Sequence, residues 1–409
     1  MCTLLLLGGY LFKAQCDGDW STGKQYRIGC YNDLKPLYGI RGMAEDRFPY
    51  IDARLEAGEL VDGGIEYPVL TGVFMWIVGV PVSDVDSYVL LSAVALAPFG
   101  LLVAYLLGRW TGRRALLWAA APALVLYAFH NWDLLVVAAT VAGLWSWRQG
   151  RSATAAALFG VGAALKMYPL LFLVPLALER WFARDREGAR LSLFVGVATV
   201  VVVNLPFVIA NPSGWWATYE FHKLRTPNFD TIWSSMPDFV PDFTPDGLNL
   251  VTLTLTVITL GAILVAAWRR TRFDGFFPFL QTSAAFLAAF MLWNKVHSPQ
   301  YTLWLLPFFV LVRVHVAWWV AYALADLAVY AGVFRFFYDF TGPTPGAEPI
   351  WRQLMVAGVW LRAALLASLC VAFMRARAED ETQATVSSHP PARFTPTGDS
   401  LARPSPAGR

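Results

Sequence analysis

The feature that most constrains this fold is a series of apolar runs that covers almost the whole chain. The composition agrees, since 57% of the 409 residues are hydrophobic and only 15% are charged, whereas an ordinary soluble domain carries about 25% charged residues. We therefore predict an all-α, polytopic membrane bundle of about twelve spans. The first run is short for a span, and we expect part of its helix to precede Met1. The runs lie near 2–13, 87–108, 115–129, 133–147, 153–165, 169–180, 191–210, 249–268, 276–293, 301–312, 316–334 and 353–374.

The arginines predict how the bundle sits in the membrane. They gather in every second connection, which marks that side as cytoplasmic. The alternate connections, 15–86, 211–248 and 335–352, are then expected outside. Segment 67–83 is apolar enough to cross, but a crossing there would invert every later loop. We therefore expect it to lie on the outer surface or to dip into it. The arginines are Arg109, Arg113, Arg114, Arg148, Arg151, Arg180, Arg184, Arg186, Arg190, Arg269, Arg270, Arg272, Arg313, Arg375 and Arg377.

These boundaries predict one membrane domain over residues 1–377. Its first extracytoplasmic loop is 15–86, and its second large outer loop is 211–248. Residues 378–409 are rich in Pro, Ser, Thr and Ala and contain almost no large apolar residue. A segment of that composition cannot bury a core, so we expect a disordered cytoplasmic tail.

Two of the four cysteines, Cys16 and Cys30, fall in the first outer loop. If that loop faces an oxidising compartment, they are expected to form a disulfide that closes a short loop. Cys2 and Cys370 lie in apolar runs and are expected to be inert packing residues.

The first outer loop also carries three candidate site acids. Asp33 lies in YNDLKPLY, just after Cys30, where a carboxylate can accept a proton from an acceptor hydroxyl. Asp52 in FPYIDAR and Glu66 in EYPVLTG compete with it, because each lies beside a Pro–Tyr or Tyr–Pro pair that stiffens the loop. The alternative for Asp33 is a solvated loop aspartate.

A short outer turn, HNWD, joins two of the predicted helices and contains His130, Trp132 and Asp133. Asp133 is either a second site acid or the N-cap of a helix that begins at Leu134. Lys166 in ALKMYP is flanked by apolar residues and needs a counter-charge. A lipid phosphate or a carboxylate such as Asp133 would supply it.

The second outer loop combines basic and aromatic side chains. Its tryptophans suit the headgroup interface, and aromatic rings also stack on sugars. His222 is a further site candidate, and the planar guanidinium of Arg225 suits a pair of phosphate oxygens. Lys295 and His297, on either side of Val296, are placed to hold a phosphate or pyrophosphate. His297 is expected to titrate near neutral pH, and its alternative is a structural role.

Several function classes lack their signatures. The sequence has no GxGxxG or Walker A motif, which argues against nucleotide-driven chemistry in the cytosol. No His/Cys cluster has zinc spacing. The net charge of +3 does not imply nucleic acid as a partner. We therefore expect no metal and no other cofactor.

Taken in chain order, the motifs resemble the glycosyltransferase 87 (DUF2029) group of the GT-C superfamily. They are YNDLKPLY, EYPVLTG, HNWDLL, ALKMYP, the aromatic loop with Arg225, and HSPQYTLWLLP. The group includes actinobacterial mannosyltransferases that depend on polyprenyl-phosphate mannose. The resemblance covers nearly the whole chain apart from the tail. It implies a multi-span bundle with surface-lying helices in the first outer loop and Asp33 as the catalytic base. It also implies that His297 corresponds to a histidine that is implicated in some members of the family.

The function that this resemblance implies is an inverting hexosyltransferase of the plasma membrane with an extracytoplasmic active site. A sugar, expected to be mannose, would move from a polyprenyl phosphate to a lipid or cell-envelope glycan acceptor. Lys166, Arg225 and Lys295 would hold the donor phosphate, and membrane lipids would surround the bundle. The alternative class is a lipid-linked sugar flippase or transporter, which would use Lys166 and Asp133 without a base in the loop. A non-catalytic scaffold is a third reading.

Overall fold

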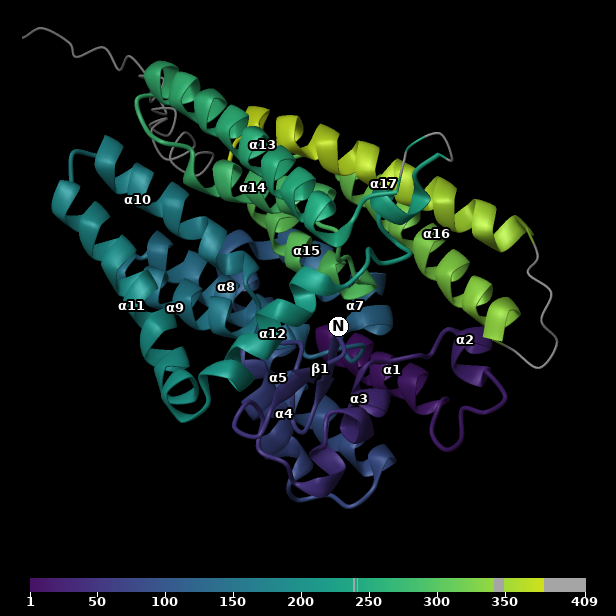
Figure 1. The fold of residues 1–409 in the computed structure, drawn as a ribbon. Coiled ribbons are helices and arrows are strands. Elements are labelled where there is room, and N and C mark those ends of the chain that lie inside the picture. Colours follow the sequence, from purple (N-terminus) through teal and green to yellow (C-terminus); the bar gives the residue numbers. More distant parts are fainter. Residues whose placement is uncertain (238–239, 241, 342–348, 379–409) are drawn as a thin grey trace, which may run out of the picture.

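The computed structural model describes residues 1–237, 240, 242–341 and 349–378 and is shown in Figure 1. Within these residues the only sheet is a two-stranded hairpin, and the rest forms helices and their connections. The predicted all-α fold class is therefore confirmed.

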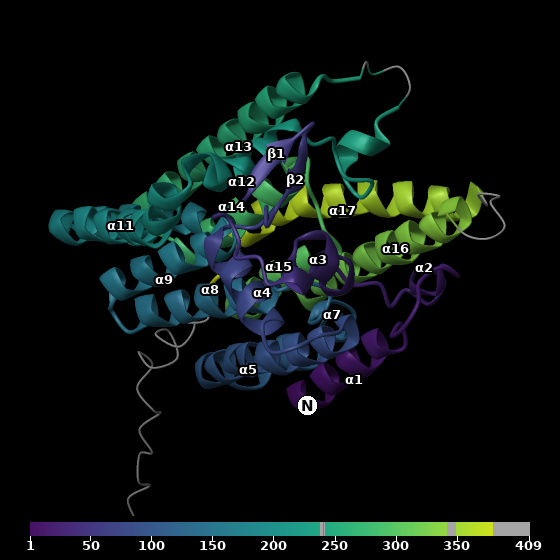
Figure 2. The ribbon, with the colours of Figure 1, turned by 60° about the horizontal axis from the view of Figure 1, so that its bottom comes forward.

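The amino-terminal part consists of one apolar helix and a connection built from short elements. The hairpin is antiparallel, with Leu55 opposite Leu60, and it packs on α12 (Pro212–Leu224), as Figure 2 shows. The elements are α1 (Cys2–Ala14), α2 (Lys24–Ile28), α3 (Leu34–Ile40), η1 (Met43–Glu45), β1 (Arg54–Glu56), β2 (Glu59–Val61) and α4 (Val69–Gly79).

α4 covers most of the apolar segment 67–83. It follows Pro68, whose φ of −62° suits the entry to a helix. With 11 residues, it is about 16 Å long, roughly half the thickness of the hydrocarbon core. α4 is too short to cross the membrane, which agrees with a surface-lying helix. Its location at the outer surface stays a prediction.

The remaining helices form the bundle. They are α5 (Val85–Thr111), η2 (Gly112–Ala115), α6 (Leu116–Ala119), α7 (Pro122–Tyr127), α8 (Asp133–Arg148), α9 (Ser152–Leu165), η3 (Tyr168–Phe172), α10 (Leu173–Phe182), α11 (Arg186–Ala210), η4 (Ile232–Ser235), α13 (Pro245–Asp274), α14 (Phe279–Trp293), η5 (Pro299–Tyr301), α15 (Thr302–Leu311), α16 (Val316–Thr341) and α17 (Pro349–Arg375).

The core lies around α15, in which every residue is buried. By contrast, only 11% of the most apolar stretch of α11 is buried inside the protein, and the buried share is the same for α13. These two helices present apolar side chains outward, as expected for helices that face lipid. α9 packs closely on α11, since a Cβ on Gly160 would lie 2.7 Å from the carbonyl oxygen of Gly196.

Five helices of the described part are long and apolar enough to cross a membrane. They are the continuous stretch Val85–Ala119, then α11, α13, α16 and α17. Each apolar run of the sequence falls on helical structure, but three runs are divided. Run 115–129 is divided between η2, α6 and α7, where Pro122 starts a new helix, run 169–180 between η3 and α10, and run 301–312 between η5 and α15. The expected count of about twelve spans stays a prediction.

Two of the expected outer loops contain more helix than the sequence indicated. In 211–248, α12 occupies the first part and α13 begins at Pro245. In 335–352, α16 continues to Thr341 and α17 begins at Pro349. Residues 342–348 lie outside the described part. Ala378 pairs with Val312 in an isolated bridge, and the rest of the predicted tail, 379–409, also lies outside the described residues.

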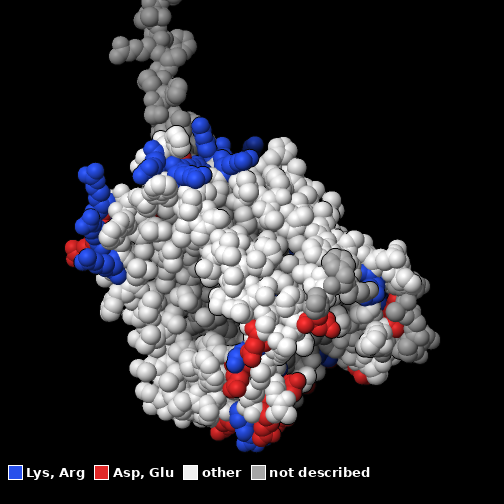
Figure 3. All heavy atoms as spheres, turned by 45° about the horizontal axis from the view of Figure 1, so that its top comes forward, with Lys and Arg blue, Asp and Glu red and all other residues white. Residues whose placement is uncertain are grey.

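The arginine-bearing connections lie close together in space. Arg114 donates to the carbonyl oxygen of Val310 at 2.8 Å, and the backbone N–H of Arg313 donates to the carbonyl oxygen of Arg377 at 2.8 Å. Arg270 donates to two carbonyl oxygens at the end of α17. Figure 3 shows lysines and arginines gathered at one end of the molecule and acidic residues mainly away from it. This agrees with the alternation in the sequence, while the cytoplasmic orientation stays a prediction.

Candidate functional site

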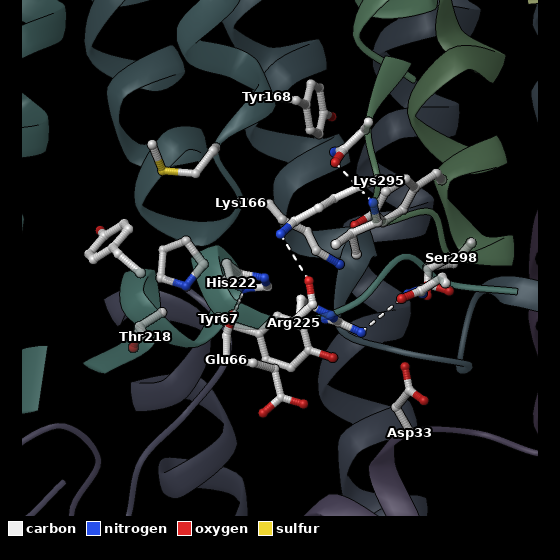
Figure 4. A pocket seen from close by; sticks show the side chains of 18 of the residues that line it. Asp33, Glu66, Tyr67, Lys166, Tyr168, Thr218, His222, Arg225, Lys295 and Ser298 are labelled. Atoms are coloured by element: carbon white, nitrogen blue, oxygen red, sulfur yellow. Dashed lines mark hydrogen bonds between the residues drawn. The ribbon is translucent and has the colours of Figure 1, made fainter. Parts of the chain in front are cut away.

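Two adjoining cavities lie at the end of the bundle away from the arginine-bearing connections. The first cavity has a volume of about 600 Å³ and lies between the first loop, α12, α13 and the connections after α9 and α14 (Figure 4). The second cavity, of about 890 Å³, lies between the tip of the hairpin, the loop after α12 and α16. The residues that line both are Tyr31, Asp33, Arg225, Asn228 and Ser298.

Asp33 stands where the two cavities meet. It precedes the first residue of α3, and its backbone N–H donates to the carbonyl oxygen of His130 at 2.7 Å. Its Oδ2 accepts a hydrogen bond of 2.8 Å from Nδ2 of Asn131. Burial raises the pKa of Asp33 to about 6, and the hydrogen bond from Asn131 opposes that rise. The carboxyl group therefore titrates in a range that suits a general base.

Asn131 is a site residue that the sequence reasoning missed. Its side chain is buried, its Oδ1 accepts from the backbone N–H of Trp132 at 2.6 Å, and its Nδ2 donates to both Asp33 and the Tyr67 hydroxyl. The bond from Trp132 fixes which end of the amide faces the carboxylate. The only signal in the sequence was its place inside HNWD, between the candidate residues His130 and Trp132.

Lys166, which lines the first cavity, forms an ion pair with the buried Asp133. Nζ of Lys166 lies 2.5 Å from Oδ1 of Asp133. The ammonium also lies 5.0 to 5.5 Å from the ring centres of Tyr67, Tyr301 and Trp304, a distance at which aromatic faces attract cations. The sequence suggested a lipid phosphate or a carboxylate such as Asp133 as the counter-charge of Lys166, and in the structure Asp133 pairs with it.

The interpretation of Asp133 as an N-cap is wrong. α8 begins at Asp133 itself, Trp132 takes the cap position, and the carboxylate points to Lys166 instead of its own helix. Ion pairing with Lys166 takes precedence over capping, because leaving the buried carboxylate of Asp133 without a partner would cost far more than one open backbone N–H.

Arg225 and Lys295 approach the first cavity from the end of α12 and from the connection after α14. Nη2 of Arg225 donates to Oδ1 of Asn228 at 2.8 Å, and Asn228 Nδ2 donates to the carbonyl oxygen of His297 at 2.6 Å. Asn228 therefore fixes the loop after α12 against the connection after α14. Lys295 donates to the carbonyl oxygens of Lys223 and Arg225 at 3.0 and 2.9 Å.

These bonds let Lys295 satisfy carbonyl groups at the carboxyl end of α12, where a cation is favoured. Burial, and then the charge of Arg225, lower the pKa of Lys295 to about 8. Lys295 thus has a structural task besides its place in the cavity wall.

Three other candidates differ in where they lie. Glu66 lines the first cavity and is paired with Arg41, whose Nε is 2.7 Å from Oε2. His222 also lines it, with Nε2 2.7 Å from the carbonyl oxygen of Glu66, and burial lowers its pKa. Asp52 is exposed and lines neither cavity.

His297 lines the second cavity but not the first, so the structure separates it from Lys295. Its side chain is 2% exposed, and Nε2 has no hydrogen-bond partner among the described residues. Burial lowers the pKa of His297 well below its ordinary value, with the charge of Arg362 acting in the same direction. The expectation that His297 titrates near neutral pH is therefore wrong, because its environment disfavours the charged ring.

A disulfide joins Cys16 and Cys30. It closes the stretch between α1 and Tyr31, which leads directly to Asp33. Cys2 and Cys370 are buried and free, as expected of packing residues.

Comparison with known proteins decides the family. The sequence model of glycosyltransferase family 87 matches residues 66–293, more than half of the chain. The chain belongs to glycosyltransferase family 87. The predicted family is confirmed, and with five candidate spans among its described residues this member of family 87 is a multi-pass membrane glycosyltransferase.

Among relatives of this family 87 protein is GPI mannosyltransferase 1 of Saccharomyces cerevisiae. It is 25% identical over 243 residues, which are 52% of this chain and 58% of the yeast protein. The chain thus spans a little over half the length of that relative. A crystal structure of ArnT from Cupriavidus metallidurans bound to undecaprenyl phosphate is also similar. The match covers 90% of this chain and 76% of the ArnT chain, with 13% sequence identity and a TM-score of 0.42.

Proposed function

We propose that this protein transfers a mannosyl group from a polyprenyl phosphate to a hydroxyl of a lipid or cell-envelope glycan, at the outer face of the plasma membrane and with inversion. The observation that carries the proposal is the position of Asp33, between a cavity lined by cations and a second cavity open to an acceptor. The family and the name of the yeast relative support mannosyl transfer.

In this proposal the first cavity takes the donor headgroup. Lys166, Arg225 and Lys295 line it and supply positive charge for the phosphate. The departing polyprenyl phosphate is already an anion, so the reaction needs cations to stabilise it and does not need a general acid. The cavity also touches Asn249 and Thr252 of α13, the helix whose apolar side chains are largely uncovered, so a prenyl chain can leave toward lipid.

The second cavity takes the acceptor. A hydroxyl oxygen of the acceptor attacks the anomeric carbon, and Asp33 takes the hydroxyl proton as the bond forms. The bond between that carbon and the phosphate oxygen breaks, and its electron pair leaves with the phosphate. A single displacement of this kind inverts the anomeric centre and uses one carboxylate, in contrast to the pair that retaining glycosidases require.

The test is transfer from radiolabelled polyprenyl-phosphate mannose in membranes that contain the protein, with identification of the labelled product. Asp33→Asn should lower transfer by about 10²-fold or more and leave expression and membrane insertion intact. Asp52→Asn is the matched control, because it removes a carboxylate of the same loop that lies outside both cavities. Normal activity of Asp33→Asn would remove that residue from the role of base.

A lipid-linked sugar flippase is the second candidate, because an ion pair such as Lys166–Asp133 at a cavity wall is also found in transport pathways. Reconstituted vesicles distinguish the two functions. Movement of the lipid-linked sugar across the bilayer without a covalent product would favour the flippase.

A further inference from the structure

A buried lysine that plays no part in donor binding lies behind the second cavity. Lys13, in the last turn of α1, is 1% exposed. Its Nζ donates to the carbonyl oxygen of Tyr31 at 2.7 Å, lies 3.3 Å from Nδ1 of His130, and donates to the hydroxyl of Tyr330 at 3.4 Å. All three partners are neutral groups that offer lone pairs. Within the described residues, no ion pair joins Lys13 to a carboxylate.

These contacts determine where His130 carries its hydrogen. A lysine ammonium has three N–H donors and no acceptor, so each of its partners must present a lone pair. While Lys13 is protonated, Nδ1 of His130 is therefore unprotonated, and the hydrogen of the neutral ring lies on Nε2. Burial, and next the charge of Lys13, lower the pKa of His130 well below its ordinary value, which agrees with a ring that stays neutral.

His130 also lies at the right place to meet an acceptor. It lines the second cavity together with Asp33, and its own carbonyl oxygen accepts the backbone N–H of Asp33 at 2.7 Å. Its ring rests against Tyr31 and Phe334, with centres 5.7 and 6.1 Å apart, and both of these residues line the same cavity. The charged and titratable groups that act on His130 from its surroundings are Lys13, Tyr31, Asp33, Lys166 and Tyr330.

We propose that His130 binds the acceptor, donating from Nε2–H to an acceptor oxygen, and that Lys13 is the positioning residue that holds the ring in this tautomer. The inference deepens the proposed function and rests on it. With one of its two lone pairs engaged by His130, the acceptor hydroxyl directs its hydrogen toward Asp33 and keeps the other lone pair for attack on the anomeric carbon. No proton passes through the imidazole, and Asp33 alone takes the proton that the acceptor loses.

The tautomer can be measured without turnover. Solid-state NMR of the full-length protein in lipid bilayers, with ¹⁵N-labelled histidine, should show a signal with Nε2 protonated and Nδ1 bare at pH 5 to 6, where Lys13 is protonated. His130→Gln identifies it by removing it from among the five histidines. In Lys13→Met the same ring should populate both tautomers or gain a proton within that range. A ring that is protonated on Nδ1 in the wild type would overturn the proposal.

Sugar binding is tested in the same samples with methyl α-mannopyranoside as the probe. Its addition should shift the Nε2 signal of His130 in the wild type, and the shift should be absent or much smaller in Lys13→Met. A titration that moves other histidine signals and leaves that of His130 unchanged would contradict acceptor binding at this ring.

The Michaelis constants for acceptor and donor distinguish acceptor binding by His130 from a purely structural role. Loss of one hydrogen bond between neutral groups should raise the acceptor KM of His130→Leu by about three- to tenfold, with the donor KM unchanged. His130→Gln keeps an N–H donor and should recover most of the loss. An equal rise of both KM values would contradict the proposal. If no polyprenyl-phosphate sugar is transferred at all, the proposed function fails, while the two NMR measurements still decide the place of His130.

Discussion

Nδ2 of Asn131 donates to Oδ2 of Asp33 at 2.8 Å and to the hydroxyl of Tyr67 at 2.7 Å. One amide group therefore joins the proposed base to a ring that lies 5.0 Å from the ammonium of Lys166. Through this contact the carboxylate on the acceptor side and the cation on the donor side share one rigid support.

Loss of this amide should weaken the base. Asn131→Ala removes a hydrogen bond to a charged group, worth about 1.5–3 kcal/mol, so kcat/KM should fall by about 10- to 100-fold. Tyr67→Phe keeps the bond to Asp33 and should cost less. The measurement is the initial rate of mannosyl transfer with both proteins at equal amounts in membranes. Equal losses in the two variants would show that the bond to Asp33 has no special role.

The pH dependence of the transfer rate should reflect the titration of the Asp33 carboxyl group. Because burial raises its pKa to about 6, the carboxylate needed as base is present above that pH and is lost as the pH falls through it. The rate should therefore decline on the acid side around pH 6. In Asn131→Ala the charged form loses a donor, which raises the pKa further and moves the acid limb to higher pH. An acid limb at the same pH in both proteins would mean that another group limits the rate.

Separation of the pair Lys166–Asp133 should cost stability as well as activity. Asp133→Asn leaves the partly buried ammonium of Lys166 without its counter-charge, which should cost about 1–3 kcal/mol. A lower unfolding temperature in detergent is the expected result. Asp52→Asn serves as the control for loss of a surface carboxylate, since Asp52 is exposed. An unchanged unfolding temperature in Asp133→Asn would show that another group, such as a lipid phosphate, stabilises Lys166.

The disulfide should stabilise the first loop by restricting the unfolded chain. With a sequence separation of 14 residues between Cys16 and Cys30, loop-closure entropy gives a contribution of about 3 kcal/mol. Reductant should lower the unfolding temperature of the wild type and leave the double variant Cys16→Ser/Cys30→Ser unaffected. Cys370→Ala, which removes a buried free thiol, should respond to reductant as the wild type does. Identical curves for the wild type with and without reductant would contradict the prediction.

The candidate site was only partly readable from the sequence. Asp33, Lys166 and Arg225 stood out because charges beside apolar runs are costly and need a purpose. Asn131 did not stand out, because a neutral amide in a short turn has no chemical signature of its own. Lys13 was hidden in an apolar helix, and its partner Tyr330 lies far away along the chain.

The sequence by itself determined the helical class, the family and the segments that become helices, since these depend on local composition and on the order of motifs. Only the tertiary structure decided which ions pair, which histidine lies beside Asp33 and which acid lines both cavities. Such relations join residues separated by 33 positions in Lys166–Asp133 and by 117 in Lys13–His130. Partners this distant are set by how helices pack, and the local pattern does not encode that packing.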